Sequence, residues 1–141
     1  MNSDVASQAI SAEEALAQSS PAPAEPAAIW KARRFIGEHF CDDEFSLQIV
    51  ADEVKMNATY LSERFKETTG VTFMSWVAIL RVKRACELLA TGNLRVTDVA
   101  FEAGFHSLSQ FNRTFRRLRG ESPREFRLAH PKIENTTRIL D

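Results

Sequence analysis

The chain has 141 residues, of which 44% are hydrophobic and 26% are charged, and its formal net charge at pH 7 is −1. This length suits one domain with a tail or linker. We expect no membrane span and no signal peptide, and two cysteines at apolar helical positions favour a cytoplasmic protein with reduced thiols. The three histidines are far apart, without a Gly-rich phosphate loop or paired carboxylates, so we expect no enzyme, no metal site and no cofactor.

The N-terminal stretch, residues 1–28, is rich in Ala, Ser, Pro and Glu and has few apolar groups to bury. We interpret it as a disordered tail or an interdomain linker. The spacing of apolar residues over 29–40 then predicts a helix with three basic side chains facing outward: Lys31, Arg33 and Arg34.

A first helix-turn-helix unit is predicted over residues 46–70. Ser46 is the expected N-cap of a short helix, and Asn57 is the expected N-cap of the next one. Gly70 has the position of a C-terminal glycine. The second helix buries two apolar residues, with a tyrosine at the edge of the core: Leu61, Phe65 and Tyr60.

The longest periodic apolar run covers residues 72–91 and contains no proline. It predicts a linker helix of about 30 Å, because an α-helix rises about 1.5 Å per residue. This helix leads from the first unit to a second one.

The second unit is predicted over residues 95–120, where Gly104 ends one short helix and Ser107 caps the next. The buried positions of this next helix follow helical spacing: Leu108, Phe111, Phe115 and Leu118. Its other face is polar and basic, and residues 107–129 contain six arginines and two glutamates. Such a local positive surface suits contact with phosphates, although the near-neutral total argues against a non-specific polycation.

A last helix is predicted over residues 122–129. Ser122 caps it, Pro123 is at its first position and Glu125 completes a capping box, while Phe126 and Leu128 dock it on the core. Residues 130–141 are expected to be a C-terminal tail. In total, the pattern predicts an all-α fold of about seven helices, with two helix-turn-helix units joined by a long linker helix in a domain over 29–129.

The two units resemble each other, since 47–70 aligns with 96–120 after one inserted residue in the turn. A repeat of about 50 residues built on a helix-turn-helix gives two candidate DNA-reading helices, although a chance match between two amphipathic hairpins is the alternative. Lys55 occupies the turn position of Gly104, so the first turn has either a different backbone conformation or a strained one.

The expected length of the linker helix has a functional implication. Major-groove segments on one face of B-DNA recur about every 34 Å. A connector of about 30 Å therefore predicts that both second helices enter successive major-groove segments of one duplex.

Residues 29–129 resemble the DNA-binding domain of the AraC/XylS family of bacterial transcription regulators. The resemblance is carried by VAFEAGF at 99–105, SQFNRTFR at 109–116 and GESPREFR at 120–127, and it is supported by Arg81, Ala85 and the leucine pair at 88–89. It implies a monomeric domain that binds double-stranded DNA at a promoter and activates transcription through RNA polymerase. Members usually carry a sensor or dimerisation domain, so the chain is either a small stand-alone member or, as we favour, a fragment.

Six residues are expected to read bases. In the first unit they are Thr59, Ser62 and Glu63, because hydroxyls bond to several bases and a carboxylate accepts from cytosine N4. Ser109, Gln110 and Arg113 are assigned to the matching positions of the second unit, where Gln suits adenine and Arg suits guanine. The alternatives are a solvated helix face, an ion pair of Glu63 with Lys66 or Arg64, and a phosphate contact for Arg113.

Six further residues are expected to contact the DNA backbone through charge or through the N–H groups of a helix start: Asn57, Lys66, Ser107, Arg116, Arg117 and Arg124. Five aromatic residues fall on the apolar stripes and are assigned to the core rather than to base stacking: Phe65, Trp76, Phe105, Phe111 and Phe115. The alternative function is a helical protein-interaction module that does not bind DNA.

Overall fold

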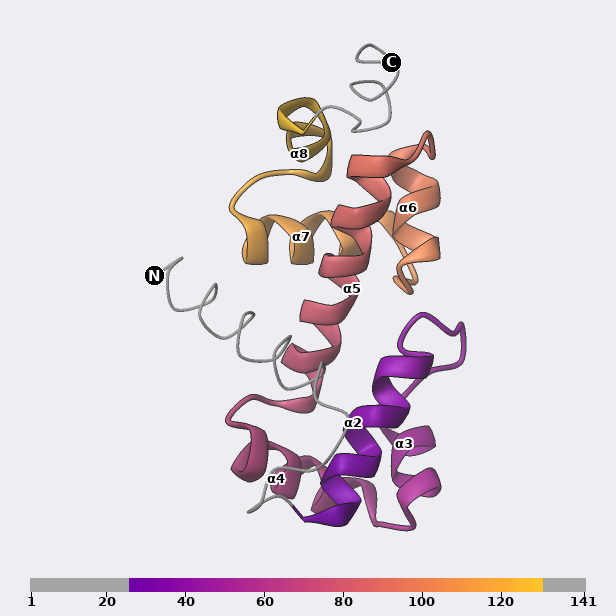
Figure 1. Cartoon of the computed structure of the whole chain (residues 1–141), viewed down its shortest axis with the longest axis vertical. Helices are drawn as coiled ribbons and strands as arrows, with labels where there is room; N and C mark the ends of the chain where they lie inside the picture. Colours follow the sequence, from indigo (N-terminus) through magenta and orange to yellow (C-terminus); the bar gives the residue numbers. More distant parts are fainter. Residues whose placement is uncertain (1–25, 131–141) are drawn as a thin grey trace, which may run out of the picture. The chain divides into compact units, whose positions relative to one another are not determined.

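The computed structural model of the chain describes residues 26–130. This part contains seven α-helices and no strand (Figure 1), which confirms the predicted all-α fold. Apart from 26–28 and 130, the predicted tails lie outside the described residues. None of the described helices has the length and apolar character needed to cross a membrane. The chain divides after Leu80 into two compact units, and this boundary falls inside the long helix α5 (Phe73–Thr91).

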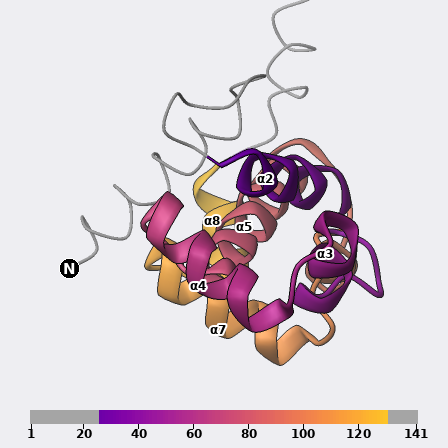
Figure 2. The same ribbon diagram turned by 90° about the horizontal axis from the view of Figure 1, so that it is seen from below.

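The first unit contains α2 (Ala27–His39), α3 (Leu47–Val54), α4 (Ala58–Thr69) and the start of α5. Helices α2, α3 and α4 pack on one another (Figure 2). The predicted outward position of Arg33 is wrong, because Arg33 is only 4% exposed. Since α2 contacts both α3 and α4, the covered part of its surface is wide enough to include this residue. The largest fully buried side chains of this unit include Ile29, Ile36, Val50, Leu61, Phe65 and Trp76.

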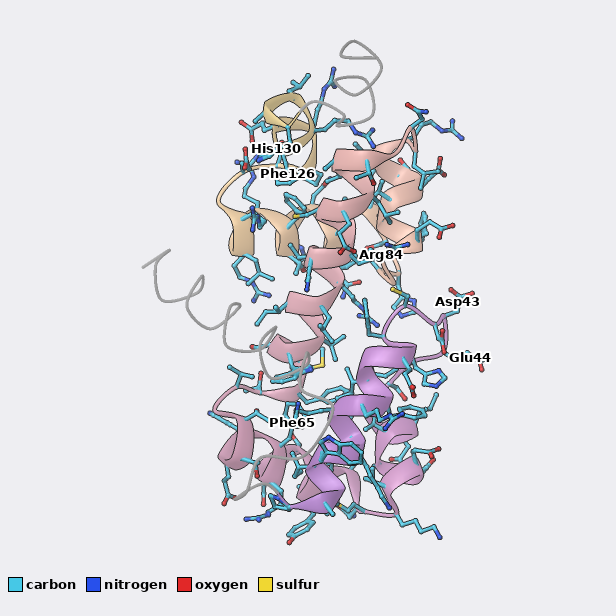
Figure 3. The ribbon with its side chains drawn as sticks, in the orientation of Figure 1. Asp43, Glu44, Phe65, Arg84, Phe126 and His130 are labelled. Atoms are coloured by element: carbon cyan, nitrogen blue, oxygen red, sulfur yellow. The ribbon has the colours of Figure 1, made fainter. Side chains whose placement is uncertain are left out.

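The second unit contains the rest of α5 with α6 (Val96–Glu102), α7 (Leu108–Arg119) and α8 (Pro123–Ala129). Phe126 of α8 lies beside His130, with ring centroids 4.0 Å apart (Figure 3). Two predicted core positions are wrong, because Leu108 is 38% exposed and Leu128 is 75% exposed. Residues two apart on a helix point about 200° apart, so Leu128 faces away when Phe126 faces the core. The core of this unit includes Val82, Leu89, Val99, Phe105, Phe111 and Phe115.

The turn between α3 and α4 and the turn between α6 and α7 have the same backbone hydrogen bond. The N–H of Met56 donates to the carbonyl of Ala51 at 2.9 Å, and the N–H of Phe105 donates to the carbonyl of Ala100 at 3.0 Å. This is the six-residue bond of a Schellman motif, which needs a left-handed residue just before the donor. Lys55 has φ 58° and Gly104 has φ 99°. The first turn therefore uses the strained alternative, because a lysine there carries a Cβ that glycine lacks.

Helices α4 and α7, the second helices of the two helix-turn-helix motifs, match residue by residue. Helices α4 and α7 each contain 12 residues and each end at a left-handed glycine, Gly70 or Gly120. Each also begins at a side-chain N-cap, which confirms the predicted capping by Asn57 and Ser107. The residues of the two helices therefore correspond at a fixed separation of 50 positions.

The same register continues into the helix that follows each of them, which is α5 after α4 and α8 after α7. Thr72 Oγ1 accepts from the N–H of Ser75 at 3.1 Å, and Ser122 Oγ accepts from the N–H of Glu125 at 3.0 Å. The edge-on ring pair Phe65–Trp76 has a counterpart in the pair Phe115–Phe126, with centroid distances of 5.3 Å and 5.7 Å. The repeat thus extends beyond the stretches 47–70 and 96–120 that the sequence predicts, to the start of α5 in one unit and to α8 in the other.

Candidate nucleic-acid interface

Helix α7 has a buried aromatic face and an exposed polar face. Phe111 and Phe115 have no exposed surface, and Ser107 Oγ holds the first turn by accepting from the N–H of Gln110 at 3.1 Å. Apart from Leu108, the exposed residues of the helix carry hydroxyl, amide and guanidinium groups: Ser109, Asn112, Arg113, Arg116, Arg117 and Arg119. This composition supplies both the donors that base edges accept and the positive charge that phosphates attract.

Two of these arginines are held by other parts of the second unit. Arg116 Nη2 lies 3.6 Å from Glu125 Oε1, and the Arg119 guanidinium lies over the ring of Phe126 at 5.4 Å. In contrast, Arg113 and Arg117 form no ion pair with any residue of 26–130. Their charges are therefore available to a ligand without the loss of an internal partner.

Glu125 is the residue that compensates Arg116, and it also completes the predicted capping box. Its Oε1 accepts from the N–H of Ser122 at 2.7 Å. This backbone hydrogen bond, followed by that of the Ser122 side chain and by the charge of Arg116, holds the pKa of Glu125 below its ordinary value. Glu125 is therefore charged at neutral pH, and a phosphate contact by Arg116 competes with this carboxylate.

Gln110 is half-buried, and its side-chain oxygen accepts from the backbone N–H of His106 at 3.4 Å. A bidentate contact with adenine uses both the oxygen and the nitrogen of the amide. An amide oxygen has two lone pairs, so the weak bond from His106 leaves one of them for adenine.

Helix α4 presents a polar face of different charge. Asn57 Oδ1 accepts from the N–H groups of Thr59 at 2.9 Å and Tyr60 at 3.2 Å, so its oxygen is used to cap the helix. Thr59, Glu63 and Lys66 are exposed, and Ser62 is half-buried. The helix carries two acids and two bases, of which Arg64 and Glu67 lie 3.4 Å apart. Its net charge is therefore zero.

The register corrects one predicted match between the two helices. Thr59 corresponds to Ser109 and Glu63 to Arg113, as expected, but Gln110 corresponds to Tyr60 instead of Ser62. The predicted place of Tyr60 at the edge of the core is also wrong, because this residue is 52% exposed. The two N-cap residues are the signal that identifies this register from the sequence, since counting from each cap removes the effect of the inserted turn residue.

Other parts of the described chain are less suited to nucleic acid. The loop between α2 and α3 borders a hollow of about 420 Å³ whose lining includes three acidic residues, of which Asp43 and Glu44 are labelled in Figure 3. Carboxylates repel phosphates, so this hollow is not a DNA-binding surface. Within residues 26–130, no group of three or more His, Cys, Asp or Glu residues has an arrangement that holds a metal ion.

Comparison with known proteins places the chain from within α3 to the end of α8 in a known family domain. Residues 50–129 match the family model described as a helix-turn-helix domain. The chain is 32% identical over 97 residues to the arabinose operon regulatory protein of Escherichia coli (strain K12), which covers 69% of this chain and 33% of that protein. It is also 32% identical over 93 residues to the melibiose operon regulatory protein of the same strain, with coverages of 66% and 30%. The chain thus spans about a third of the length of these relatives.

Two solved structures show the same arrangement of helices. The C-terminal domain of AraT, a response regulator from Geobacillus stearothermophilus, has a TM-score of 0.73 at 27% identity, covering 77% of this chain and 90% of that one. The DNA-binding domain of AdpA, a global transcriptional factor solved in complex with a target DNA, has a TM-score of 0.68 at 29% identity, with coverages of 74% and 93%.

Proposed function

The chain belongs to the AraC/XylS family of DNA-binding transcription regulators, and we propose that α4 and α7 read a promoter sequence in two successive segments of the major groove. The observation that carries this proposal is the surface of α7, where the exposed Arg113 and Arg117, which form no ion pair within residues 26–130, lie outside a fully buried pair of phenylalanines. The second helix of a helix-turn-helix enters the major groove with its N-terminal residues at the base edges. Both α4 and α7 have the capped first turn and the polar outer face that this role requires.

The roles of individual residues follow from where each one lies on its helix. We assign base reading to Thr59, Ser62 and Glu63 of α4 and to Ser109, Gln110 and Arg113 of α7. Arg113 is the strongest of these candidates, because its guanidinium matches the two acceptors of guanine and has no internal ion pair in residues 26–130.

The DNA backbone is assigned to residues that supply charge or a helix start, without sequence choice. Lys66 and Arg117 are exposed and suit phosphates directly, whereas Arg116 must exchange Glu125 for a phosphate. The remaining backbone candidates are Asn57, Ser107 and Arg124.

The whole protein is proposed to be a cytoplasmic transcriptional activator that contacts RNA polymerase. The match to about a third of the length of the relatives supports a second domain, for sensing or dimerisation, that acts with the domain over 29–129. By itself this domain is proposed to be a monomer, because its two units give one chain both recognition helices.

Selection of bound duplexes from a random pool of about 25 base pairs tests the proposal directly. At near-physiological salt we expect an enriched motif of two blocks about ten base pairs apart, the period with which the major groove returns to one face. One block alone contradicts reading by both units. No enrichment contradicts sequence-specific binding and favours a protein-interaction module. Arg84→Ala is a matched control that removes an exposed arginine outside the recognition helices, and it should select the same motif.

A further inference from the structure

Tyr60 is a large aromatic residue that remains half exposed on the outer side of α4. It is 52% exposed, and its hydroxyl forms no hydrogen bond to any residue in the described part of the chain. The backbone N–H of Tyr60 donates a hydrogen bond to Asn57 Oδ1. Single exposed apolar residues are common on protein surfaces, so the position of Tyr60 on α4 has to decide whether it has a function.

That position is the third residue of the helix, in the turn that a recognition helix directs at base edges. Tyr60 precedes Glu63 by one helical turn, so both side chains lie on the outward part of α4. Helical side chains also lean toward the N-terminus of their helix. Tyr60 therefore projects toward the end of α4 that approaches the floor of the groove. Gln110 occupies the same position on α7.

The charge of α4 also favours a contact by an uncharged side chain. Its two acids cancel its two bases, whereas α7 has four arginines and no acid. Counterion release, which drives binding through positive charge, therefore contributes little at α4. A helix of this kind depends on hydrogen bonds and apolar contacts with the bases, and Tyr60 is its largest exposed apolar group.

We propose, on the basis of the proposed DNA-binding function, that Tyr60 is a specificity-determining residue whose ring packs against the 5-methyl group of a thymine in the first block of the site. The thymine methyl is the apolar group that bases present in the major groove. A phenol ring can cover this methyl group without any positive charge on α4. Its hydroxyl remains able to bond to a phosphate or to water.

Deoxyuridine substitution tests this contact, because it removes only the methyl group of a thymine. Each thymine of the first block of the selected duplex is replaced in turn, and binding is measured by fluorescence anisotropy. For the wild type we expect one position at which the loss of the methyl weakens binding about fourfold, as for the burial of one methyl-sized group. Tyr60→Phe should show the same loss at this position, and Tyr60→Ala should show none.

Two further variants separate this contact from a general loss of binding. Gln110→Ala changes the matched position of the other helix and should retain the fourfold loss. Tyr60→Gln should shift the preferred base at this position from thymine to adenine, because Gln bonds to adenine through both amide atoms. Circular dichroism checks that each variant is folded.

The proposal for Tyr60 is overturned if Tyr60→Ala and the wild type lose the same affinity at every deoxyuridine position, if no position affects the wild type, or if the first block has no thymine. These results leave DNA binding intact. Equal binding of the wild type to the selected duplex and to a scrambled one overturns the proposed function itself.

Discussion

The stretches 57–77 and 107–127 have the same backbone plan and different surfaces. Both begin at a side-chain cap, continue as a helix of 12 residues, pass a left-handed glycine and start a further capped helix. Both bury an edge-on aromatic pair. The first stretch has two acids and two bases, whereas the second has six arginines and two glutamates.

The difference shows which positions define the fold and which define the ligand. Buried apolar residues and caps are retained because the packing and the helix ends depend on them. Charge differences at exposed positions include Glu67, which corresponds to Arg117, and Met74, which corresponds to Arg124. A further one lies at the end of the stretch, where the buried Val77 corresponds to the half-buried Arg127. Under the proposed function, the second unit supplies most of the electrostatic affinity, and the first unit contributes mainly through uncharged contacts.

The largest expected effect is the loss of either buried phenylalanine. Phe65→Ala and Phe115→Ala should each lower the free energy of unfolding of their unit by about 3–5 kcal/mol, because both rings are fully buried. Urea denaturation followed by circular dichroism measures this change, with Lys31→Ala as an exposed control. A cost below about 1 kcal/mol for one of them means that the two units are not packed alike.

The shared left-handed turn position predicts effects of opposite sign. Gly104→Ala should lower the free energy of unfolding by about 1–2 kcal/mol, because a residue with a Cβ is disfavoured at the positive φ of 99°. Lys55→Gly should raise it by about 0.5–1 kcal/mol, since strain is relieved and part of the gain is offset by the entropy of glycine. Thermal unfolding of both variants measures these shifts. If Lys55→Gly destabilises the protein, the strained conformation is not the native one.

A single charge reversal tests whether the units differ mainly in electrostatics. Glu67→Arg gives α4 the residue that α7 has at this position. We expect tighter binding to all duplexes and a salt dependence that is steeper by about one. Stability should change little, because the pair of Glu67 with Arg64 is exposed. An unchanged salt dependence places this position away from the phosphates and weakens the comparison.

The smallest effect concerns the capping box that only the second stretch completes. The pKa of Glu125 is lowered in the folded state, so its contribution to stability is present above the unfolded pKa and is lost as the pH falls through the folded pKa. Glu125→Gln should therefore reduce the loss of unfolding free energy between about pH 5 and pH 3. Ser75→Glu places the same carboxylate in the first stretch and should increase that loss. No change in either variant contradicts the assigned role of the box.

Local chemistry explains which features the sequence predicts well. Ser46, Asn57, Ser107 and Ser122 each cap the helix assigned to them, because a cap depends on residues only two or three positions away. The all-α fold and the aromatic core likewise follow from helical periodicity.

The features that the sequence does not predict depend on the tertiary surroundings. Periodicity locates the apolar side of α2 but not the width of the surface that its neighbours cover, so the burial of Arg33 requires the structure. Leu128 is exposed because α8 has only one covered side. The 52% exposure of Tyr60 is missed because periodicity does not show where the covered side of α4 ends. The site residues themselves remain predictions, which the DNA-binding measurements test.

The most direct test of the proposed division of roles compares two arginines of α7. Wild type, Arg113→Ala and Arg117→Ala are titrated onto the selected duplex and its single-base variants at several salt concentrations. Arg113→Ala should cost about 1–3 kcal/mol on the preferred site and relax one base position, whereas Arg117→Ala should weaken all sequences alike and lower the salt slope by about one. If both variants act identically on every sequence, α7 does not read bases through Arg113, and the central claim is wrong.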